Sequence, residues 1–139
     1  MRFTRTAIAV SLAVLLVACA EAARPGAEPG LDGTWQLERA IVDGVELELI
    51  ESHPVTIQFD GRQVGGTAAC NTYGGALVEE DTRLIGEMSI TEMACIPPET
   101  MELESAYMAA LTRVTNAVVR GESLKLEAEG IELTFTPKV

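Results

Sequence analysis

Period-two alternation on both sides of one helical segment limits the folds open to this chain more than any other feature. Short runs of alternating apolar and polar residues precede residue 98 and return after residue 116, as in half-buried β-strands. Between them lies one helical face, formed by Leu103, Tyr107, Ala110, Leu111 and Val114. This order predicts an α+β fold, in which a curled or partly closed antiparallel sheet packs against one α-helix and a final β-hairpin follows.

The ends of the predicted helix carry residues that suit a helix start and stop. Pro98 is placed to begin the helix, because the first turn does not need its missing N–H. Three glutamates, Glu99, Glu102 and Glu104, lie toward the positive end of the dipole, and Arg113 lies toward the negative end. We therefore expect a stable helix here.

Turn signals divide the alternating runs. Asp43-Gly44 and Asp60-Gly61 predict tight turns, and Glu79-Glu80-Asp81 predicts the turn of another hairpin. Cys70 to Gly75 is interpreted as a tight loop, since asparagine and paired glycines permit a sharp return, whereas Gly65 and Gly66 indicate a bulge or a close backbone approach. The predicted strands are 33–37, 45–49, 55–59, 62–68, 76–78, 83–86, 88–93, 117–119, 124–126 and 131–135.

The first 18 residues are predicted to be a secretory signal. Arg2 and Arg5 precede an apolar run from Ala7 to Ala18 that is shorter than the roughly 20 residues of a membrane span. The sequence Leu16-Val17-Ala18-Cys19 resembles the bacterial lipobox, in which the cysteine becomes the first mature residue and carries lipid such as palmitate. An ordinary signal peptide and an uncleaved anchor are the alternatives. Residues 19–30 are rich in alanine, proline and glycine and are expected to form a flexible tether to a single domain at 31–139.

The charge of the chain excludes some partners. The formal net charge is −11, and loss of residues 1–18 removes two arginines and no acid, which makes it −13. Such a protein repels nucleic acid and anionic lipid headgroups. Membrane attachment is therefore expected through lipid at Cys19 alone, on a protein that we expect to be a monomer of the cell envelope. Ala20 follows the cysteine, which in a Gram-negative host resembles lipoproteins of the outer membrane that face the periplasm.

Two cysteine motifs give the chain a family resemblance. Gly66 precedes Cys70-Asn71-Thr72-Tyr73, and Thr91-Glu92-Met93-Ala94-Cys95 follows at a fixed spacing; Gly33-Thr34-Trp35 and the strand that ends at Asp60 also match. The chain resembles the META domain (HslJ-like) family over 31–139, except that Ala69 stands where many members have glycine. The resemblance implies an α+β half-barrel, no enzyme activity, no cofactor, and an association with envelope stress and antibiotic tolerance.

Cys70 and Cys95 are the two cysteines that remain once Cys19 carries lipid. In an oxidising compartment they are predicted to form a disulfide, which for a loop of this size stabilises the fold by about 3–4 kcal/mol. Two buried thiols are the alternative. A redox-active pair is disfavoured, because there is no Cys-x-x-Cys motif and no basic residue nearby.

No residue of the chain stands out as catalytic or metal-binding. His53, the single histidine, is interpreted as a surface loop residue beside Pro54, and no serine has the context of a nucleophile elbow. A metal site would need a His/Cys cluster, and the acids at 79–81 lack the alternating oxygen ligands of a calcium loop. We therefore predict neither catalysis nor a metal.

Two functional classes remain open. The first is a non-enzymatic envelope module that binds a protein partner or protects the envelope under stress. The alternative is a carrier or sensor of a small apolar ligand held between sheet and helix. Its candidate lining residues, which could equally be ordinary core, are Trp35, Phe59, Tyr107, Met108 and Leu111.

Overall fold

The computed structural model describes residues 30–80 and 82–139. The predicted signal (1–18), Cys19 and all of the predicted tether except Gly30 lie outside this range, as does Asp81. The described chain forms one helix, α1 (Glu99–Leu111), and ten strands. The strands are β1 (Gly33–Val42), β2 (Val45–Glu46), β3 (Thr56–Asp60), β4 (Gln63–Ala68), β5 (Asn71–Glu80), β6 (Arg83–Ile85), β7 (Ser89–Ile90), β8 (Asn116–Arg120), β9 (Ser123–Ala128) and β10 (Ile131–Pro137).

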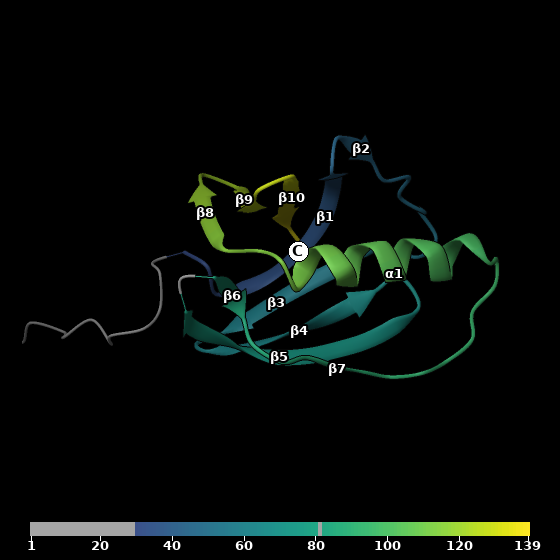
Figure 1. Ribbon diagram of the computed structural model, residues 1–139, viewed down its shortest axis with the longest axis horizontal. Helices are drawn as coiled ribbons and strands as arrows, with labels where there is room; N and C mark the ends of the chain where they lie inside the picture. The colour runs from purple at the N-terminus through teal and green to yellow at the C-terminus, as the bar shows by residue number, and fades with distance from the viewer. Residues whose placement is uncertain (1–29, 81) are drawn as a thin grey trace, which may run out of the picture.

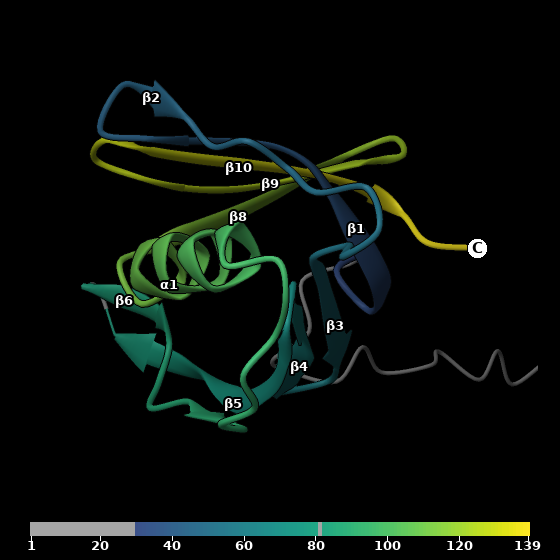
Figure 2. The same ribbon diagram turned by 90° about the vertical axis from the view of Figure 1, so that its right-hand side faces the viewer.

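The strands form one antiparallel sheet that curls into a nearly closed half-barrel. Their order is β6-β5-β4-β3-β1-β10-β9-β8, while β2 adds to β1 and β7 adds to β5. The two ends of the sheet approach each other where the Leu84 amide donates to the Val114 carbonyl at 2.7 Å. Figure 1 shows the strands in this order, and Figure 2, along α1, shows the helix lying in the trough. The predicted α+β half-barrel with its final hairpin, β9–β10, is confirmed.

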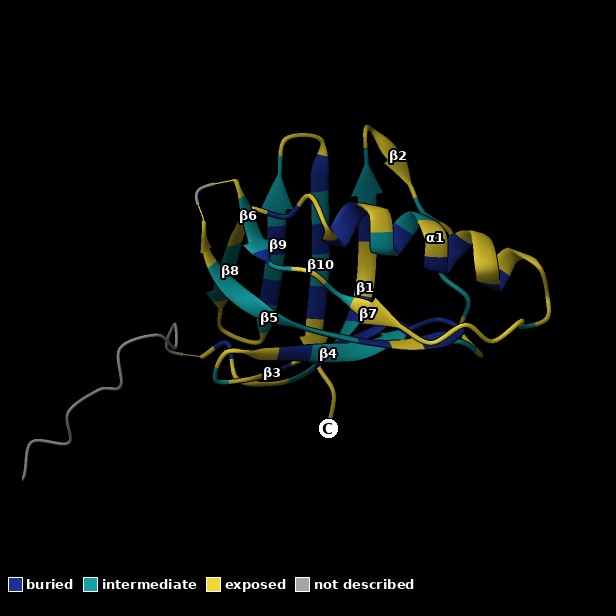
Figure 3. Ribbon diagram, turned by 60° about the horizontal axis from the view of Figure 1, so that its bottom comes forward, coloured by how far each residue is buried: buried dark blue, intermediate teal, exposed yellow. Residues whose placement is uncertain are grey.

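The trough is filled by side chains of the helix and of the inward-facing strand positions. Leu103, Tyr107, Ala110 and Leu111 are buried along α1, as the helical spacing predicts, and Val114 is buried just past the end of the helix. Figure 3 shows buried residues along the strands that face α1. Each fully buried large apolar side chain contributes about 1.5–3 kcal/mol, so this core accounts for the helix position. The apolar strand residues with no more than 1% exposure are Ala40, Ile57, Phe59, Ala68, Ile85, Leu124, Leu126, Leu133 and Phe135.

The tight loop predicted for 70–75 is wrong. The chain turns earlier, at Ala69-Cys70, and Asn71 begins the ten-residue strand β5. Gly74 and Gly75 lie inside that strand, and neither has a positive φ. A Cβ atom on Gly75 would lie 2.9 Å from Cγ of Met88 and 3.0 Å from the Glu87 carbonyl oxygen. Gly75 therefore permits close packing, a requirement that looks the same as a turn in sequence.

Two predicted strands are much shorter than their alternation suggests. The runs 45–49 and 88–93 pair only at Val45–Glu46 and Ser89–Ile90. After one more backbone bond, from the Leu47 amide to the Ala40 carbonyl of β1, the chain leaves the sheet, and Leu47, Leu49 and Ile50 pack against the core. The alternating pattern therefore indicates that one side of the segment is apolar, but it does not show that the backbone pairs with a neighbouring strand. Conversely, β1 is twice as long as the predicted 33–37.

The remaining turn predictions are confirmed. Asp43 and Gly44 both have positive φ, 51° and 82°, as a tight hairpin turn requires. Glu80 pairs with Arg83 across the hairpin between β5 and β6. The register of β4 on β5 is continuous through Gly65 and Gly66, so the two glycines mark a close approach and not a bulge.

Candidate functional site

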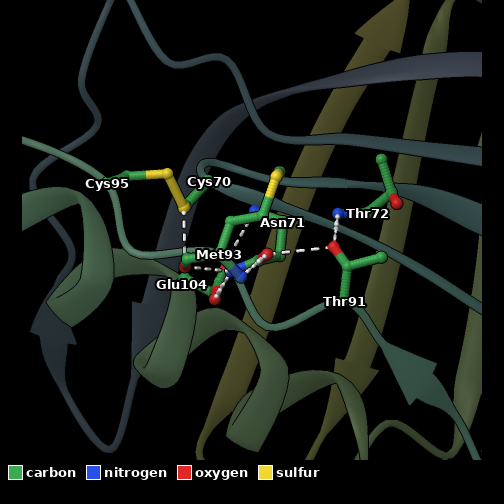
Figure 4. Close-up of a disulfide and its surroundings, with 7 residues drawn as sticks. All are labelled: Cys70, Asn71, Thr72, Thr91, Met93, Cys95 and Glu104. Carbon is green, nitrogen blue, oxygen red and sulfur yellow. Dashed lines mark hydrogen bonds between the residues drawn. A yellow bond between two sulfur atoms is a disulfide. The ribbon is translucent and has the colours of Figure 1, made fainter.

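Asn71 joins the two cysteine motifs to each other and to the helix. We call Asn71, Thr91, Met93 and Glu104 the Asn71 network (Figure 4). Oδ1 of Asn71 accepts from the Met93 amide at 2.7 Å and from the Thr91 hydroxyl at 2.9 Å. Nδ2 donates to the Met93 carbonyl at 3.1 Å and to the Glu104 carboxylate at 2.8 Å. Every polar atom of the Asn71 side chain is thus used to hold neighbouring segments in place.

Glu104 is the buried charge of this network. It projects from the second turn of α1, is 7% exposed, and also accepts from the Asn71 amide at 2.6 Å. A buried carboxylate needs such partners, because burying a charge without hydrogen bonds is costly. In sequence, Glu104 is grouped with the glutamates that favour the helix dipole, and this buried role is not predicted. The available signal was its spacing of three and seven residues from Tyr107 and Leu111, which puts it on the apolar face.

The structure joins Cys70 to Cys95, with their Cα atoms 5.9 Å apart. The bond lies beside the Asn71 network, and Sγ of Cys70 approaches the Met93 carbonyl at 3.4 Å. Ala69, immediately before, has a φ of 68°, in the left-handed region. Glycine would reach this conformation without steric cost, so the alanine here is under more backbone strain than a glycine would be. Disulfide and network together fix 91–95 against β5 and α1.

A pair of buried tyrosines links α1 to the sheet. The Tyr73 hydroxyl donates to the Thr56 carbonyl at 2.9 Å, and the hydroxyls of Tyr73 and Tyr107 are 2.8 Å apart. The rings meet edge to face, with centroids 5.9 Å apart. Burial raises the pKa of both phenols well above the usual value. Gly66 leaves room for this arrangement, because a Cβ atom there would lie 2.9 Å from the Tyr73 hydroxyl and would collide with the Thr56 carbonyl.

Among the described residues, the remaining titratable candidates are not arranged as a catalytic or metal-binding site. His53 lies half-buried in the loop between β2 and β3, where Nδ1 is 3.0 Å from the Ser52 hydroxyl. Within residues 30–80 and 82–139 no carboxylate is hydrogen-bonded to this imidazole, and no three Asp, Glu, His or Cys side chains are grouped as metal ligands. Glu79 and Glu80 instead pair with Arg62 and Arg83. In the same described range no helix has the length and apolarity needed to cross a membrane.

The residues suggested to line an apolar ligand site lie in the core. Trp35, Phe59, Tyr107 and Leu111 are at most 5% exposed and belong to one buried cluster, against which Met108 packs. The Trp35 indole donates to the Leu31 carbonyl at 2.9 Å. These side chains are part of one packed cluster, as ordinary core residues are.

An open groove lies beside the start of α1, on the side of the helix that faces away from the Asn71 network. We call it the acidic groove; its volume is about 640 Å³. It lies between the segment that follows β2 and the first two turns of α1, both at the right of Figure 1. Its lining residues are Glu46, Leu47, Glu48, Ile50, Pro97, Glu99, Glu102, Leu103 and Ala106. Ile50 and Leu103 also border a smaller hollow of about 210 Å³, which reaches His53.

Four carboxylates and no basic side chain line the acidic groove. Arg39 reaches one of them, Glu46, through hydrogen bonds of 3.0 and 3.3 Å that lower the pKa of the Glu46 carboxyl. The side chains of Glu99 and Glu102 make no hydrogen bond or ion pair within the described residues. The groove therefore combines an apolar floor with a negative rim.

Exposed apolar side chains mark the segment that the Asn71 network holds. Ile90, Met93 and Ile96 are 38%, 55% and 85% exposed. Ile96 directly precedes Pro97 of the acidic groove. Several large apolar side chains exposed along one ordered segment are typical of a surface that binds another molecule.

Comparison with known proteins identifies the fold family. The sequence model of the META domain matches residues 29–139, so the chain belongs to the META domain family. A protein of Burkholderia xenovorans with an NMR structure has 28% identity, with 78% of this chain and 84% of that chain aligned and a TM-score of 0.65. A second NMR structure, at 21% identity, 77% and 90% coverage and a TM-score of 0.57, shares the fold. No curated protein matches the chain significantly.

Proposed function

We propose that this protein is a non-enzymatic module of the bacterial cell envelope that is anchored by lipid at Cys19 and binds a protein partner. One observation carries the partner-binding role. The Asn71 network and the disulfide immobilise residues 91–95, in which Met93 is exposed and which exposed Ile96 directly follows. A segment ordered in advance loses little conformational entropy on binding, which favours recognition by another protein.

The chemistry of the domain supports a binding role over catalysis. Catalytic groups need a nucleophile, base or acid that can reach a substrate. The buried polar groups here, Glu104, Asn71 and the two tyrosines, bond to one another. Membership of the META domain family, associated with envelope stress and antibiotic tolerance, fits a module that acts through a partner.

Photocrosslinking in the native envelope tests the partner proposal. A photoreactive amino acid placed at Met93 or Ile96 of the full-length, lipidated protein is expected to give a discrete adduct with an envelope protein. The matched control is the same group at Glu122, which is exposed in the turn between β8 and β9. Equal adducts from all three positions, or none from Met93 and Ile96, would overturn the proposal.

Lipid anchoring is tested separately by fractionation. Cys19→Ser is expected to release the protein from the membrane fraction and to abolish labelling by a palmitate analogue, with the thermal unfolding of the domain unchanged. A variant that stays membrane-bound would show an uncleaved anchor instead.

A further inference from the structure

We propose that the acidic groove is the docking site for a basic, amphipathic segment of the partner, one that carries apolar side chains flanked by lysine or arginine. This inference rests on the proposed function and specifies the chemistry of the partner.

The floor of the acidic groove supplies the apolar half of the recognition. Leu47 and Ile50 are half-buried against the core, and Leu103 lies beneath them on α1. Pro97 and Ala106 add further apolar surface, and the volume of about 640 Å³ accommodates several side chains. Burying such a surface is favourable at about 25 cal/mol per Å² of apolar area removed from water.

The rim selects for positive charge. Glu46, Glu48, Glu99 and Glu102 carry four negative charges, of which Arg39 offsets one. The start of α1 adds the equivalent of about half a positive charge, too little to cancel the two glutamates of its own first turn. The groove therefore keeps roughly two to three negative charges. A lysine or arginine beside each apolar anchor would complement them.

The openness and surroundings of the groove favour a polypeptide over a small molecule. Small-ligand sites usually bury most of the ligand surface. Here an exposed apolar side chain continues beyond the groove, since Ile96, which directly precedes Pro97, is 85% exposed. Apolar anchors along a chain segment, laid in a groove beside a helix, form a known mode of peptide recognition.

The groove lies far from the point where the described chain enters the domain. Gly30, where the described chain begins, lies against Val119 of β8. In Figure 1 this end of the domain and the groove end, marked by β2 and the start of α1, lie on opposite sides. A partner segment in the groove would therefore leave the entry of the chain at Gly30 free.

Two matched peptides and two matched variants test the proposal on the full-length, lipidated protein in detergent. The probe is a fluorescent leucine–lysine peptide of about 14 residues, four helical turns, and its control replaces lysine with glutamate. The rim variant Glu99→Gln/Glu102→Gln is compared with Glu122→Gln/Glu129→Gln, which removes the same charge from exposed positions elsewhere. Thermal unfolding checks that both variants stay folded.

We expect the leucine–lysine peptide to bind and the leucine–glutamate peptide not to bind. The rim variant should weaken binding about three- to tenfold, and added salt should narrow that difference. The control variant should bind as the unmodified protein does. Equal loss in both variants would show attraction to net charge alone, and no loss in the rim variant would show a site elsewhere; either result overturns the proposal.

Crosslinking separates this inference from the function on which it rests. If adducts at Met93 and Ile96 persist at full strength in the rim variant, a protein partner exists but does not use the acidic groove. If a cationic detergent such as dodecyltrimethylammonium binds with rim dependence while the peptide does not, the groove takes a small amphiphile and the proposal fails.

Discussion

Two regions of the molecule use glutamates of the same helix for opposite purposes. Glu104 points inward, is 7% exposed and has both carboxylate oxygens occupied by Asn71. Glu102, two residues earlier, points to the acidic groove and has no bonded partner within the described residues. In the Asn71 network every polar atom of the Asn71 side chain and both Glu104 oxygens have a hydrogen-bond partner, and a satisfied buried network of this kind specifies one structure. The rim leaves its charges unpaired in water, where they cost little and remain available to a partner.

Two chain segments near the acidic groove differ in how firmly they are held. Residues 91–95, which precede Pro97 of the groove, are tied down by the disulfide and by three hydrogen bonds of the Asn71 side chain. The groove wall at 47–50 is held by the Leu47 amide donating to the Ala40 carbonyl, by the His53 amide donating to the Ile50 carbonyl, and by apolar packing. A segment with few backbone bonds opens at low cost, so we expect any adjustment to a partner on this wall.

The largest effect is expected from Gly66→Ala. The new methyl group would collide with the Thr56 carbonyl and displace the Tyr73 hydroxyl, which destabilises the domain by more than about 4 kcal/mol. Gly74→Ala in the facing strand is the control, because its nearest contact would be an ordinary 3.8 Å. Urea unfolding of both variants measures the difference. Equal stabilities would show that the tyrosine pair does not need the close approach at Gly66.

Asn71→Ala is expected to cost about 3–5 kcal/mol. The substitution removes four hydrogen bonds and leaves the buried Glu104 carboxylate with only the backbone amide of residue 71. Asn116→Ala, at an exposed position, should change the free energy of unfolding by less than about 0.5 kcal/mol. If the two variants were equally stable, the Asn71 network would contribute no more to the free energy of unfolding than a surface residue does.

Loss of the disulfide through Cys70→Ser/Cys95→Ser is expected to cost about 3–4 kcal/mol, in line with a sequence separation of 25 residues. The Asn71 network should keep 91–95 in place in the folded variant, because its bonds do not depend on sulfur. Thiol labelling supports the assignment in a Cys19→Ser background. Without reductant the unfolded protein should show no reactive thiol, and two reactive thiols would contradict the bond.

Alkaline pH tests the interior without a mutation. Because burial raises the pKa of Tyr73 and Tyr107, the folded state holds these protons more tightly than the unfolded state, whose phenols titrate near 10. Stability is therefore unaffected below about pH 10 and falls as the pH rises further. These are the two tyrosines of the chain, so tyrosinate absorbance reports on them alone. Absorbance and circular dichroism should change together, and tyrosinate in a folded protein near pH 10 would contradict burial.

The smallest effect on stability is expected at the rim. Glu99→Gln/Glu102→Gln loses a favourable interaction with the helix dipole but also relieves repulsion within the acidic groove, so the free energy of unfolding should change by less than about 1 kcal/mol. Thermal unfolding at low and moderate salt measures it. A large loss would place these glutamates with Glu104 as structural residues and would remove the contrast between the two regions.

Local patterns predicted much of the fold. The helical face from Leu103 to Leu111, the Asp43-Gly44 turn and the strands β3, β4, β9 and β10 follow from periodicity and turn chemistry, which act over a few residues. The two cysteine motifs were recognised from sequence as a family signature. Asn71 was among them, although no local rule reveals that its side chain bridges a strand, a loop and a helix.

The errors share one physical origin. The glycine pair Gly74-Gly75 predicts a turn and the alternating run 45–49 predicts a strand, but a glycine pair also occurs inside a strand and an alternating run also occurs in an irregular segment. Which setting applies depends on what packs opposite: Met88 against Gly75, and the core beneath Leu47 and Ile50. Strand pairing brings Met88 to Gly75, and packing against the core fixes Leu47 and Ile50; neither contact is visible in the local sequence pattern.

The sequence by itself determined the fold class, the helix, the sign of the charge and the family, because each depends on composition or on local periodicity. Only the tertiary structure decided that Glu104 is buried with Asn71 while Glu99 and Glu102 line an open groove. The reason is that burial and charge pairing are set by contacts between segments. Residues 46–50 and 97–106 form one surface only after the sheet has curled around the helix.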